Sequence, residues 1–279
     1  MSRVLIAGCG YVGTELGIRL EGAGHDVWGL RRDPGPLPPA IRPLAADLRA
    51  PLHDTALPRV DRVVYAVGAS APTAVSYRDA YVTGVRHLLA ALGRQAGPPA
   101  HFFFLSSTAV YGDAEGSWVD ERTEPAPENF RGATVLEGEA LVRGADHPGT
   151  CVRLGGIYGP GRTRLIERAR RGELRCPPGG PIWSNRIHRD DAVGVLGHLL
   201  FRAGPAPVYL AVDDEPAPLC EVYRYLAALT GGPKPAVGVS VRSTRTNKRC
   251  SNALLTASGY SFRYPTYREG YRALADAPC

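Results

Sequence analysis

Several features are absent from the sequence of 279 residues, and each absence narrows the class of protein. No apolar run approaches the roughly 18 residues that a membrane-spanning helix needs, so we expect no membrane partner. The first residues lack the charged segment and longer apolar segment of a secretory signal. The six cysteines include no C-x-x-C pair, and their spacing predicts neither a zinc site nor a disulfide framework. Together these absences predict a cytoplasmic protein in a reducing compartment, with no metal site.

The sequence also lacks any long run of lysine and arginine, although its net charge is +6 and its isoelectric point is about 9.1. The basic residues are spread along the chain in short groups, and no basic strip is interleaved with aromatic residues. This distribution argues against a nucleic-acid partner. A small anionic ligand explains the positive charge equally well.

Short apolar runs alternate with helical patterns through the first two thirds of the chain. The strand candidates are residues 4–7, 27–30, 63–67, 102–106 and 151–154, and the helix candidates between them are residues 14–22, 80–92 and 135–143. Alternation of this kind is typical of βαβ units. It predicts an α/β protein with a doubly wound parallel sheet and helices on both faces.

The pattern changes after about residue 157, where clusters of glycine and proline separate shorter elements. A strand pattern at residues 208–212 and a helical pattern at residues 219–229 indicate that this part is also folded. We therefore expect a main α/β domain in residues 1–156. Residues 157–279 are expected to form a smaller substrate-binding region and to return in part to the sheet.

A glycine-rich loop, Gly8-x-Gly10-x-x-Gly13, follows the first strand pattern and opens the first helix. In such a loop the first glycine permits the tight turn, and the second lets backbone approach a pyrophosphate. The third lets the helix pack closely on the strand. The helix N-terminus then faces the negative charge. Because strand, helix and second strand surround the motif in the right order, it predicts dinucleotide binding.

The second strand pattern ends at Arg31 and Arg32, where an acidic residue would hold the ribose 2′-hydroxyl of NAD. Two cations suit the 2′-phosphate of NADP, which a carboxylate would repel. Asp33 falls in the turn sequence Asp33-Pro-Gly35 and is better placed to cap that turn. We therefore favour NADP(H) over NAD(H). Two solvated charges at a strand end are the alternative interpretation.

Further residues at strand ends complete the predicted cofactor site. Asp47 follows a third short apolar run, and its carboxylate either accepts a hydrogen bond from the adenine amino group or caps the next segment. The predicted cofactor-binding residues are Gly8, Gly10, Tyr11, Val12, Gly13, Arg31, Arg32, Asp47, Leu48, Ala66 and Val67.

Four ordered segments resemble one known family. They are residues 4–30, FLSSTAVYG ending at Gly112, VRLGGIYGPG ending at Gly161, and NRIHRDD ending at Asp191. Together they resemble the extended short-chain dehydrogenase/reductases, the NAD(P)-dependent epimerase/dehydratase family that acts largely on nucleotide sugars. The resemblance implies a Rossmann domain, a small C-terminal substrate domain and an active-site cleft between them. It also implies a homodimer formed through the helices near residues 80–92 and 135–143.

The resemblance implies a role for Ser107, which occupies the place of the family serine or threonine that hydrogen-bonds the substrate oxygen. Family members supply the proton with a Tyr-x-x-x-Lys pair on the next helix. Here Arg131 stands at the tyrosine position and Val135 at the lysine position. No lysine precedes Lys234, so shifting the register does not recover the pair. The usual mechanism therefore cannot operate in this chain.

The candidate catalytic residues are Ser107, for orientation, and Tyr111, as a substitute phenol. The alternative for Tyr111 is a ring that packs over the cleft. The predicted substrate-binding residues are Arg131, Arg162, Asn185, Arg186 and His188. The arginines suit a carboxylate or phosphate. His188 either exchanges a proton near neutral pH or packs in the hinge.

Two functional hypotheses remain open from the sequence. The first is an NADP(H)-dependent oxidoreductase or epimerase/dehydratase that acts on a small anionic or nucleotide-sugar-like substrate without the Tyr-x-x-x-Lys pair. It depends on fold-level resemblance and on the retained serine. The second is a non-catalytic NADP(H)-binding protein that senses redox state or regulates a partner, an interpretation that the missing pair favours.

Overall fold

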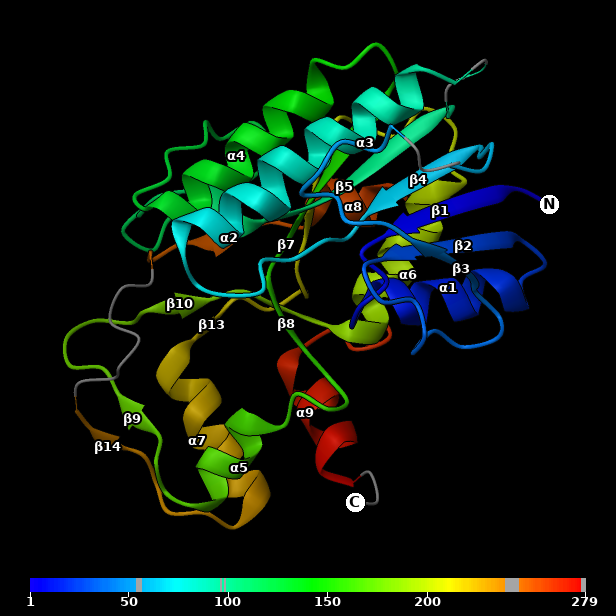
Figure 1. Cartoon of the computed structure of the whole chain (residues 1–279). Helices are drawn as coiled ribbons and strands as arrows, with labels where there is room; N and C mark the ends of the chain where they lie inside the picture. Colours follow the sequence, from blue (N-terminus) through cyan, green and yellow to red (C-terminus); the bar gives the residue numbers. More distant parts are fainter. Residues whose placement is uncertain (54–56, 96, 98, 239–245, 277–279) are drawn as a thin grey trace. The chain divides into compact units, whose positions relative to one another are not determined.

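The structure is a computed structural model that describes residues 1–53, 57–95, 97, 99–238 and 246–276. The chain divides into two compact units, which we describe separately. The first contains Met1–Val110, Pro125–Arg153 and Val193–Tyr209. The second contains Tyr111–Glu124, Leu154–Ala192 and Leu210–Cys279. Figure 1 shows the chain, with labels on many of the elements of both units.

Most of a seven-stranded sheet lies in the first unit, in the order β12-β7-β5-β4-β1-β2-β3. The strands are β1 (Arg3–Ala7), β2 (Asp26–Arg31), β3 (Arg42–Ala45), β4 (Arg62–Tyr65), β5 (His101–Ser107), β7 (Gly149–Leu154) and β12 (Val208–Ala211). Strand β1 runs parallel to β2 and β4, β2 to β3, and β4 to β5. The predicted α/β fold with a parallel sheet is confirmed. The strand order reverses between β1 and β4, where such sheets bind ligands.

The apolar runs of the sequence form the buried strands, and helices cover both faces of the sheet. Val4, Leu5, Ile6 and Ala7 of β1 are fully buried. The helices are α1 (Gly13–Gly22), α2 (Ala74–Arg78), α3 (Gly84–Gly93), α4 (Phe130–Arg143) and α6 (Arg189–Leu200). Helices α2 and α3 follow one another end to end on one face with α4 beside both, and α1 lies on the opposite face (Figure 1).

A π-helical turn, Asp79–Thr83, interrupts the helix predicted at residues 80–92 and separates α2 from α3. The Tyr65 hydroxyl donates a hydrogen bond of 2.5 Å to the carbonyl oxygen of Ala80 in this turn. A side chain at Gly84 would overlap the same hydroxyl. Because the phenol takes up a backbone carbonyl that an α-helix would use internally, the helix widens at this point.

In the residues that the structure describes, the second unit consists of short paired strands and of helices. The strand pairs are β6 (Trp118–Val119) with β15 (Arg249–Cys250), β8 (Gly156–Tyr158) with β11 (Arg186–His188), β9 (Arg175–Cys176) with β14 (Ala236–Val237), and β10 (Trp183–Ser184) with β13 (Ala217–Pro218). The helices are α5 (Arg164–Arg170), α7 (Leu219–Thr230), α8 (Ala253–Ala257) and α9 (Tyr267–Asp276). Helix α7 buries Leu219, Val222 and Leu226 in a core shared with α5 and α9. Across the described ranges, no helix is both long and apolar enough to cross a membrane.

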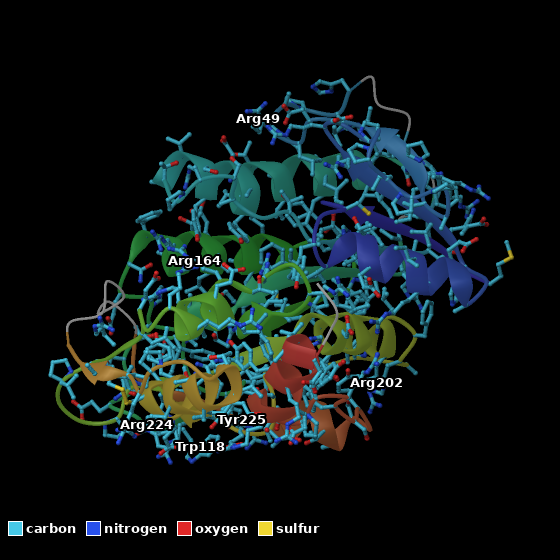
Figure 2. All side chains as sticks on the ribbon, turned by 90° about the horizontal axis from the view of Figure 1, so that it is seen from below. Arg49, Trp118, Arg164, Arg202, Arg224 and Tyr225 are labelled. Atoms are coloured by element: carbon cyan, nitrogen blue, oxygen red, sulfur yellow. A yellow bond between two sulfur atoms is a disulfide. The ribbon has the colours of Figure 1, made fainter. Side chains whose placement is uncertain are left out.

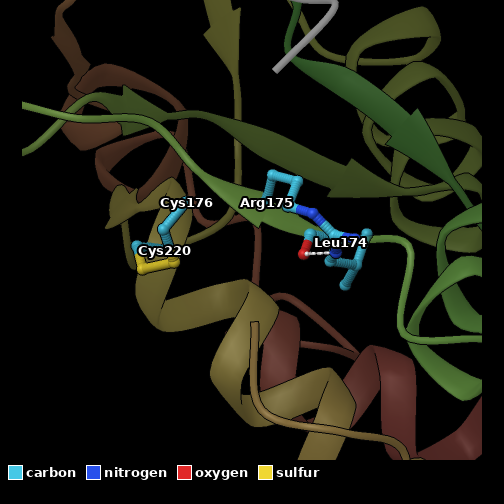
Figure 3. The surroundings of a disulfide bond; sticks show 4 residues. All are labelled: Leu174, Arg175, Cys176 and Cys220. Atoms are coloured by element: carbon cyan, nitrogen blue, oxygen red, sulfur yellow. Dashed lines mark hydrogen bonds between the residues drawn. A yellow bond between two sulfur atoms is a disulfide. The ribbon is translucent and has the colours of Figure 1, made fainter. Parts of the chain in front are cut away.

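The second unit contains a disulfide bond between Cys176 in β9 and Cys220 in α7 (Figure 3). The prediction that the cysteines form no disulfide is therefore wrong. The two residues are 44 positions apart in the sequence, and only the packing of α7 brings them together. Spacing between neighbouring cysteines carries no information about such a pair. Cys9, Cys151 and Cys250 are free and buried, and Cys279 lies outside the described residues.

Candidate functional site

The glycine-rich loop between β1 and α1 is tightly packed on its inner side. Gly8 has a φ of +86°, and a Cβ there would lie 2.5 Å from the backbone nitrogen of Val67. A Cβ at Gly13 would lie 2.7 Å from the carbonyl oxygen of Gly8. At Gly10 the nearest atom to an added Cβ would be Gly8 O, at 3.9 Å. The loop is therefore open at Gly10, the residue beside which a pyrophosphate would lie.

The first turn of α1 has no side-chain cap, because Val12 occupies the N-cap position. Backbone N–H groups at a helix N-terminus lack intrahelical partners and carry partial positive charge. Thr14 donates its hydroxyl to the carbonyl oxygen of Cys9, away from those groups. Tyr11 is half-buried in the same loop. The backbone N–H of Gly10 donates to Gly8 O at 2.7 Å, so the start of α1 at Val12 and Gly13 is the part of the loop that has the kind of helix N-terminus at which a phosphate binds.

Arg31 lies beside the glycine-rich loop, although it is far from the loop in sequence. Its Nη1 atom donates a hydrogen bond of 3.3 Å to the carbonyl oxygen of Cys9, and its side chain is half-buried. Arg32 follows at the end of β2 and is exposed. The guanidinium of Arg31 is therefore held at the carboxyl ends of β1 and β2. This is the edge of the sheet at which an adenosine ribose lies in Rossmann folds.

Asp47 forms an ion pair with Arg49, which Figure 2 labels. The Nε and Nη2 atoms of Arg49 donate to both carboxylate oxygens, and the backbone N–H of Arg49 donates to Oδ1 at 3.0 Å. The guanidinium of Arg49 holds the pKa of Asp47 below its ordinary value, and the charge of Arg32 contributes. Of the two interpretations of Asp47, the capping one describes its contacts in this structure.

The remaining predicted cofactor residues lie around the end of β4. The backbone N–H of Ala66 donates to Ala7 O at 2.7 Å, which joins this segment to the end of β1. Val67 packs against Gly8 and is half-buried. Leu48 is buried, and its carbonyl oxygen lies 2.8 Å from Nδ1 of His87. Gly8, Arg31, Ala66 and Val67 therefore gather at one edge of the sheet.

Ser107 is the last residue of β5, and α4 begins next to it. The Oγ atom of Ser107 accepts a hydrogen bond of 3.1 Å from the backbone N–H of Ala109. A side chain at Gly132 in α4 would overlap the carbonyl oxygen of Ala109. The first turn of α4, which carries exposed Arg131, therefore packs directly on the turn that follows Ser107. The structure brings these two predicted residues to the same region of the first unit.

Beneath this region lies a buried ion pair that the sequence analysis did not assign. Nε and Nη2 of Arg153 in β7 donate to the Glu139 carboxylate in α4 at 2.9 and 2.6 Å. The hydroxyl of Ser106, next to Ser107, donates to the same carboxylate at 2.5 Å. The side chains of Arg153 and Glu139 are 2% and 0% exposed. This network ties β5 and β7 to α4.

Tyr111 belongs to the second unit, and its side chain is 1% exposed. Its hydroxyl donates a hydrogen bond of 2.7 Å to the carbonyl oxygen of Asp120. Lys248, also buried, donates from Nζ to the carbonyl oxygen of Tyr111 at 2.9 Å and to the hydroxyl of Thr246. The phenol of Tyr111 thus serves an internal hydrogen bond, as the ring-packing alternative expects. No pattern near Lys248 in the sequence indicated this contact.

The other predicted substrate residues also lie in the second unit, in differing environments. Arg162 is exposed, and its Nη1 atom donates to Ile157 O. Asn185 accepts from the backbone N–H of Cys250 and donates to the carbonyl oxygen of Lys248, so its amide joins two segments. His188 is 2% exposed and packs on the rings of Tyr158 and Tyr264. Burial lowers the pKa of His188, which keeps the imidazole neutral at neutral pH.

Arg186 lies near an acidic residue that the sequence analysis did not single out, Asp213. The backbone N–H of Asp213 donates to Arg186 O at 2.7 Å. Both side chains are buried, and desolvation raises the pKa of Asp213 well above its ordinary value, while the charge of Arg186 opposes this shift. The guanidinium of Arg186 also lies over the ring of Tyr267. Arg186 is therefore part of an internal cluster of the second unit.

A sequence model of the NAD dependent epimerase/dehydratase family matches residues 4–195. The chain belongs to this family. A 3-diazoavenalumate denitrifying reductase from Streptomyces sp. is 30% identical over 96% of this chain and 98% of its own length.

Two solved structures are similar to the chain over nearly its whole length. A structure from Methylobacillus flagellatus, named after the NAD-dependent epimerase/dehydratases, is 40% identical, with a TM-score of 0.82 and coverage of 98% of this chain and 97% of its own. The protein MoeE5 in complex with UDP-glucuronic acid and NAD is 26% identical, with a TM-score of 0.78 and coverage of 96% of both chains. The family resemblance seen in the sequence is confirmed.

This family member departs from the resembling pattern at α4. Arg131 is exposed in the first turn, where its guanidinium lies over the rings of Tyr77 and Phe130. Val135, one turn later, is buried. Neither side chain can deliver a proton, because a guanidinium stays charged at any physiological pH and valine has no polar atom. The first unit therefore retains Ser107 but has no phenol and amine at these two positions.

Proposed function

We propose that this protein is a reductase that uses NADPH to transfer a hydride to a small anionic substrate. The observation that carries the proposal is the place of Arg31. Its guanidinium is hydrogen-bonded to the glycine-rich loop at the end of β2, next to Arg32. A 2′-phosphate at the ribose would meet these cations and form charge-assisted hydrogen bonds. The open side of Gly10 and the uncapped N-terminus of α1 suit the pyrophosphate.

The residues near Ser107 favour reduction over epimerisation. Epimerising a sugar requires a base that removes a hydroxyl proton and later returns it. The positions that would supply the phenol and the amine hold Arg131 and Val135. Hydride transfer to a cationic centre has no such requirement, because its product is neutral and no alkoxide forms. In the proposal, Ser107 orients the substrate and Arg131 binds its carboxylate.

The similarity to the Streptomyces reductase supports the same choice. Its name describes the reduction of an anion that bears a diazo group and the loss of nitrogen. For an arenediazonium carboxylate the atoms balance without a proton donor. The hydride forms a carbon–hydrogen bond, the carbon–nitrogen bond breaks, and its electron pair leaves with N₂. We propose this substrate class, with nucleotide sugars as the competing class that the similarity to the UDP-glucuronic acid complex suggests.

Turnover tests the proposal directly. We expect NADPH oxidation with an arenediazonium carboxylate to exceed the rate without enzyme, and we expect none with UDP-glucose or UDP-glucuronic acid. Ser107→Ala should lower kcat/KM by about tenfold, the equivalent of one hydrogen bond. Ala109→Ser, which leaves the Ser107 side chain in place, is a control at the same turn. Epimerisation of a nucleotide sugar by the wild type would contradict the proposal.

Cofactor choice is expected to depend on Arg31. Arg31→Asp removes a cation from the 2′-phosphate and adds an anion, so NADPH affinity should fall by about 10–100-fold. NADH affinity should change by less than about threefold, because NADH has no phosphate at that position. Arg202→Asp, at an exposed site after α6, matches the change in net charge. Fluorescence titration of the bound nicotinamide measures both constants. An equal loss of affinity for NADPH and for NADH would instead show that Arg31 stabilises the glycine-rich loop and does not bind the 2′-phosphate.

A non-catalytic NADP(H) sensor is the second candidate. The missing phenol and amine favour it, while the retained Ser107 argues against it. NADPH binding without turnover on carbonyl, diazonium and nucleotide-sugar compounds would select this candidate. Location in the cytoplasm and dimerisation stay predictions of the sequence.

A further inference from the structure

The Cys176–Cys220 disulfide lies outside the proposed reductase site and serves no step of it. Cys176 ends the short strand β9 and is 3% exposed, whereas Cys220 lies in the first turn of α7 and is half-buried. Figure 3 shows the disulfide bond between Cys176, at the end of β9, and Cys220, in α7. Cys220 is therefore the more exposed residue of the pair.

Both cysteines line a cavity of about 310 Å³. Its other walls are the loop that follows β9, with Pro177, Pro178, Gly179 and Gly180, the start of α7 and the edge of β14. Glycine and proline dominate the loop side, so few large side chains obstruct the disulfide. A cavity of this size accepts a small organic molecule.

The helix side of the cavity carries one charge of each sign. Arg224 lies one helical turn after Cys220, and Glu221 follows Cys220 directly. Both charged side chains are exposed, and Figure 2 labels Arg224. A molecule with both a carboxylate and an ammonium group would meet an opposite charge for each. A neutral molecule would gain neither contact.

The other described cysteines have a different environment. Cys9, Cys151 and Cys250 are each at most 1% exposed, and none of them lines this cavity. Burial raises the pKa of the Cys9 and Cys250 thiols to about 12. Such thiols are unreactive at neutral pH. Among the described cysteines, only Cys220 combines access with a cavity beside its sulfur.

We propose that the Cys176–Cys220 pair is a thiol-exchange site for a small zwitterionic peptide thiol, and that Cys220 carries the mixed disulfide. The incoming thiolate attacks Sγ of Cys220. A new sulfur–sulfur bond forms, the Cys176–Cys220 bond breaks, and its electron pair leaves on Cys176, which takes up a proton. A second thiol then attacks the mixed disulfide and releases the peptide as its own disulfide. The protein disulfide is reduced by two electrons, and two thiols are oxidised.

The reverse reaction also selects Cys220. Cys220 is the second residue of the 12-residue helix α7, and backbone N–H groups at a helix N-terminus stabilise a thiolate. In the reduced protein, the Cys220 thiolate attacks the peptide disulfide and expels one peptide thiolate. Cys176 then attacks Cys220 and restores the protein disulfide. The same mixed disulfide therefore forms in both directions.

Trapping the mixed disulfide tests the site. The full chain carries Cys279→Ser to remove the cysteine outside the described residues, and Cys176→Ser to prevent closure. Reduced protein is mixed with glutathione disulfide, and peptides are identified by mass. We expect one glutathione per chain, on Cys220, and none on Cys9, Cys151 or Cys250. Modification spread over the other cysteines, or an unmodified Cys220 in protein whose circular dichroism matches the wild type, would overturn the proposal.

A charge-reversed variant tests the ligand class. Arg224→Glu should slow the reaction with glutathione disulfide by about fivefold, the scale of one exposed ion pair. The reaction with neutral 2-hydroxyethyl disulfide should stay within about twofold, because that compound has no carboxylate. Arg202→Glu is the control for net charge. Equal slowing with both disulfides, or no slowing with either, would overturn the assignment to a charged peptide thiol.

Discussion

Replacing Glu139 by alanine is expected to lower the free energy of unfolding by about 3–5 kcal/mol. The reason is the complete burial of its partner Arg153, whose guanidinium would be left without the carboxylate that receives two of its hydrogen bonds. The hydroxyl of Ser106 would lose its acceptor as well. Denaturant unfolding followed by circular dichroism measures the change.

Two further variants distinguish the cost of leaving Arg153 buried without its partner from a general loss of stability of α4. Glu137→Ala removes a carboxylate from the same helix, but its partner Arg78 is exposed, so the expected cost is below about 1 kcal/mol. The double variant Glu139→Leu with Arg153→Met replaces the buried pair by apolar side chains and should recover most of the stability. A double variant as unstable as Glu139→Ala, or a Glu137→Ala of equal cost, would contradict this account of the pair.

Removing the Cys176–Cys220 disulfide is expected to cost about 4 kcal/mol of stability. The bond closes a loop of 44 residues, and opening a loop of that length returns about this much conformational free energy to the unfolded chain. The double variant Cys176→Ser with Cys220→Ser should therefore unfold at lower denaturant concentration than the oxidised wild type. The unfolding transition that includes α5 and α7 reports the change.

A reductant provides the matched control for that variant. Dithiothreitol should shift the wild-type transition by about the same amount and leave the double variant unchanged, because only the wild type has the bond to lose. Identical transitions for the wild type with and without reductant would show that the disulfide does not constrain the second unit.

The sheet and its glycine-rich loop could be predicted because their signals are local. Each apolar run is also a complete buried strand, as at residues 4–7, and glycine spacing alone places the turn between β1 and α1. The position of Arg31 could be predicted for the same reason. Because β1 and β2 are parallel neighbours, the end of β2 must lie next to the glycine-rich loop that follows β1. Residues within a βαβ unit are close in both sequence and space, so a pattern in the sequence is enough.

Features that depend on distant contacts could not be predicted. The π-helical turn at Asp79–Thr83 exists because Tyr65, in another element, takes up the carbonyl oxygen of Ala80. Likewise, no pattern around Glu139 indicates that its ion-pair partner is Arg153 in β7. No pattern around Lys248 indicates that its amine contacts the carbonyl oxygen of Tyr111. These partners are set by three-dimensional packing, which residue spacing does not encode.

Calorimetric titration of the wild-type chain with NADPH and with NADH, under identical conditions, measures directly whether the first unit is a site for NADPH. We expect NADPH to bind at least about tenfold more tightly than NADH, because one charge-assisted contact to the 2′-phosphate contributes this much affinity. Equal or tighter binding of NADH would contradict the role of Arg31. If neither dinucleotide binds, the glycine-rich loop is a structural turn only, and the proposed reductase function is wrong.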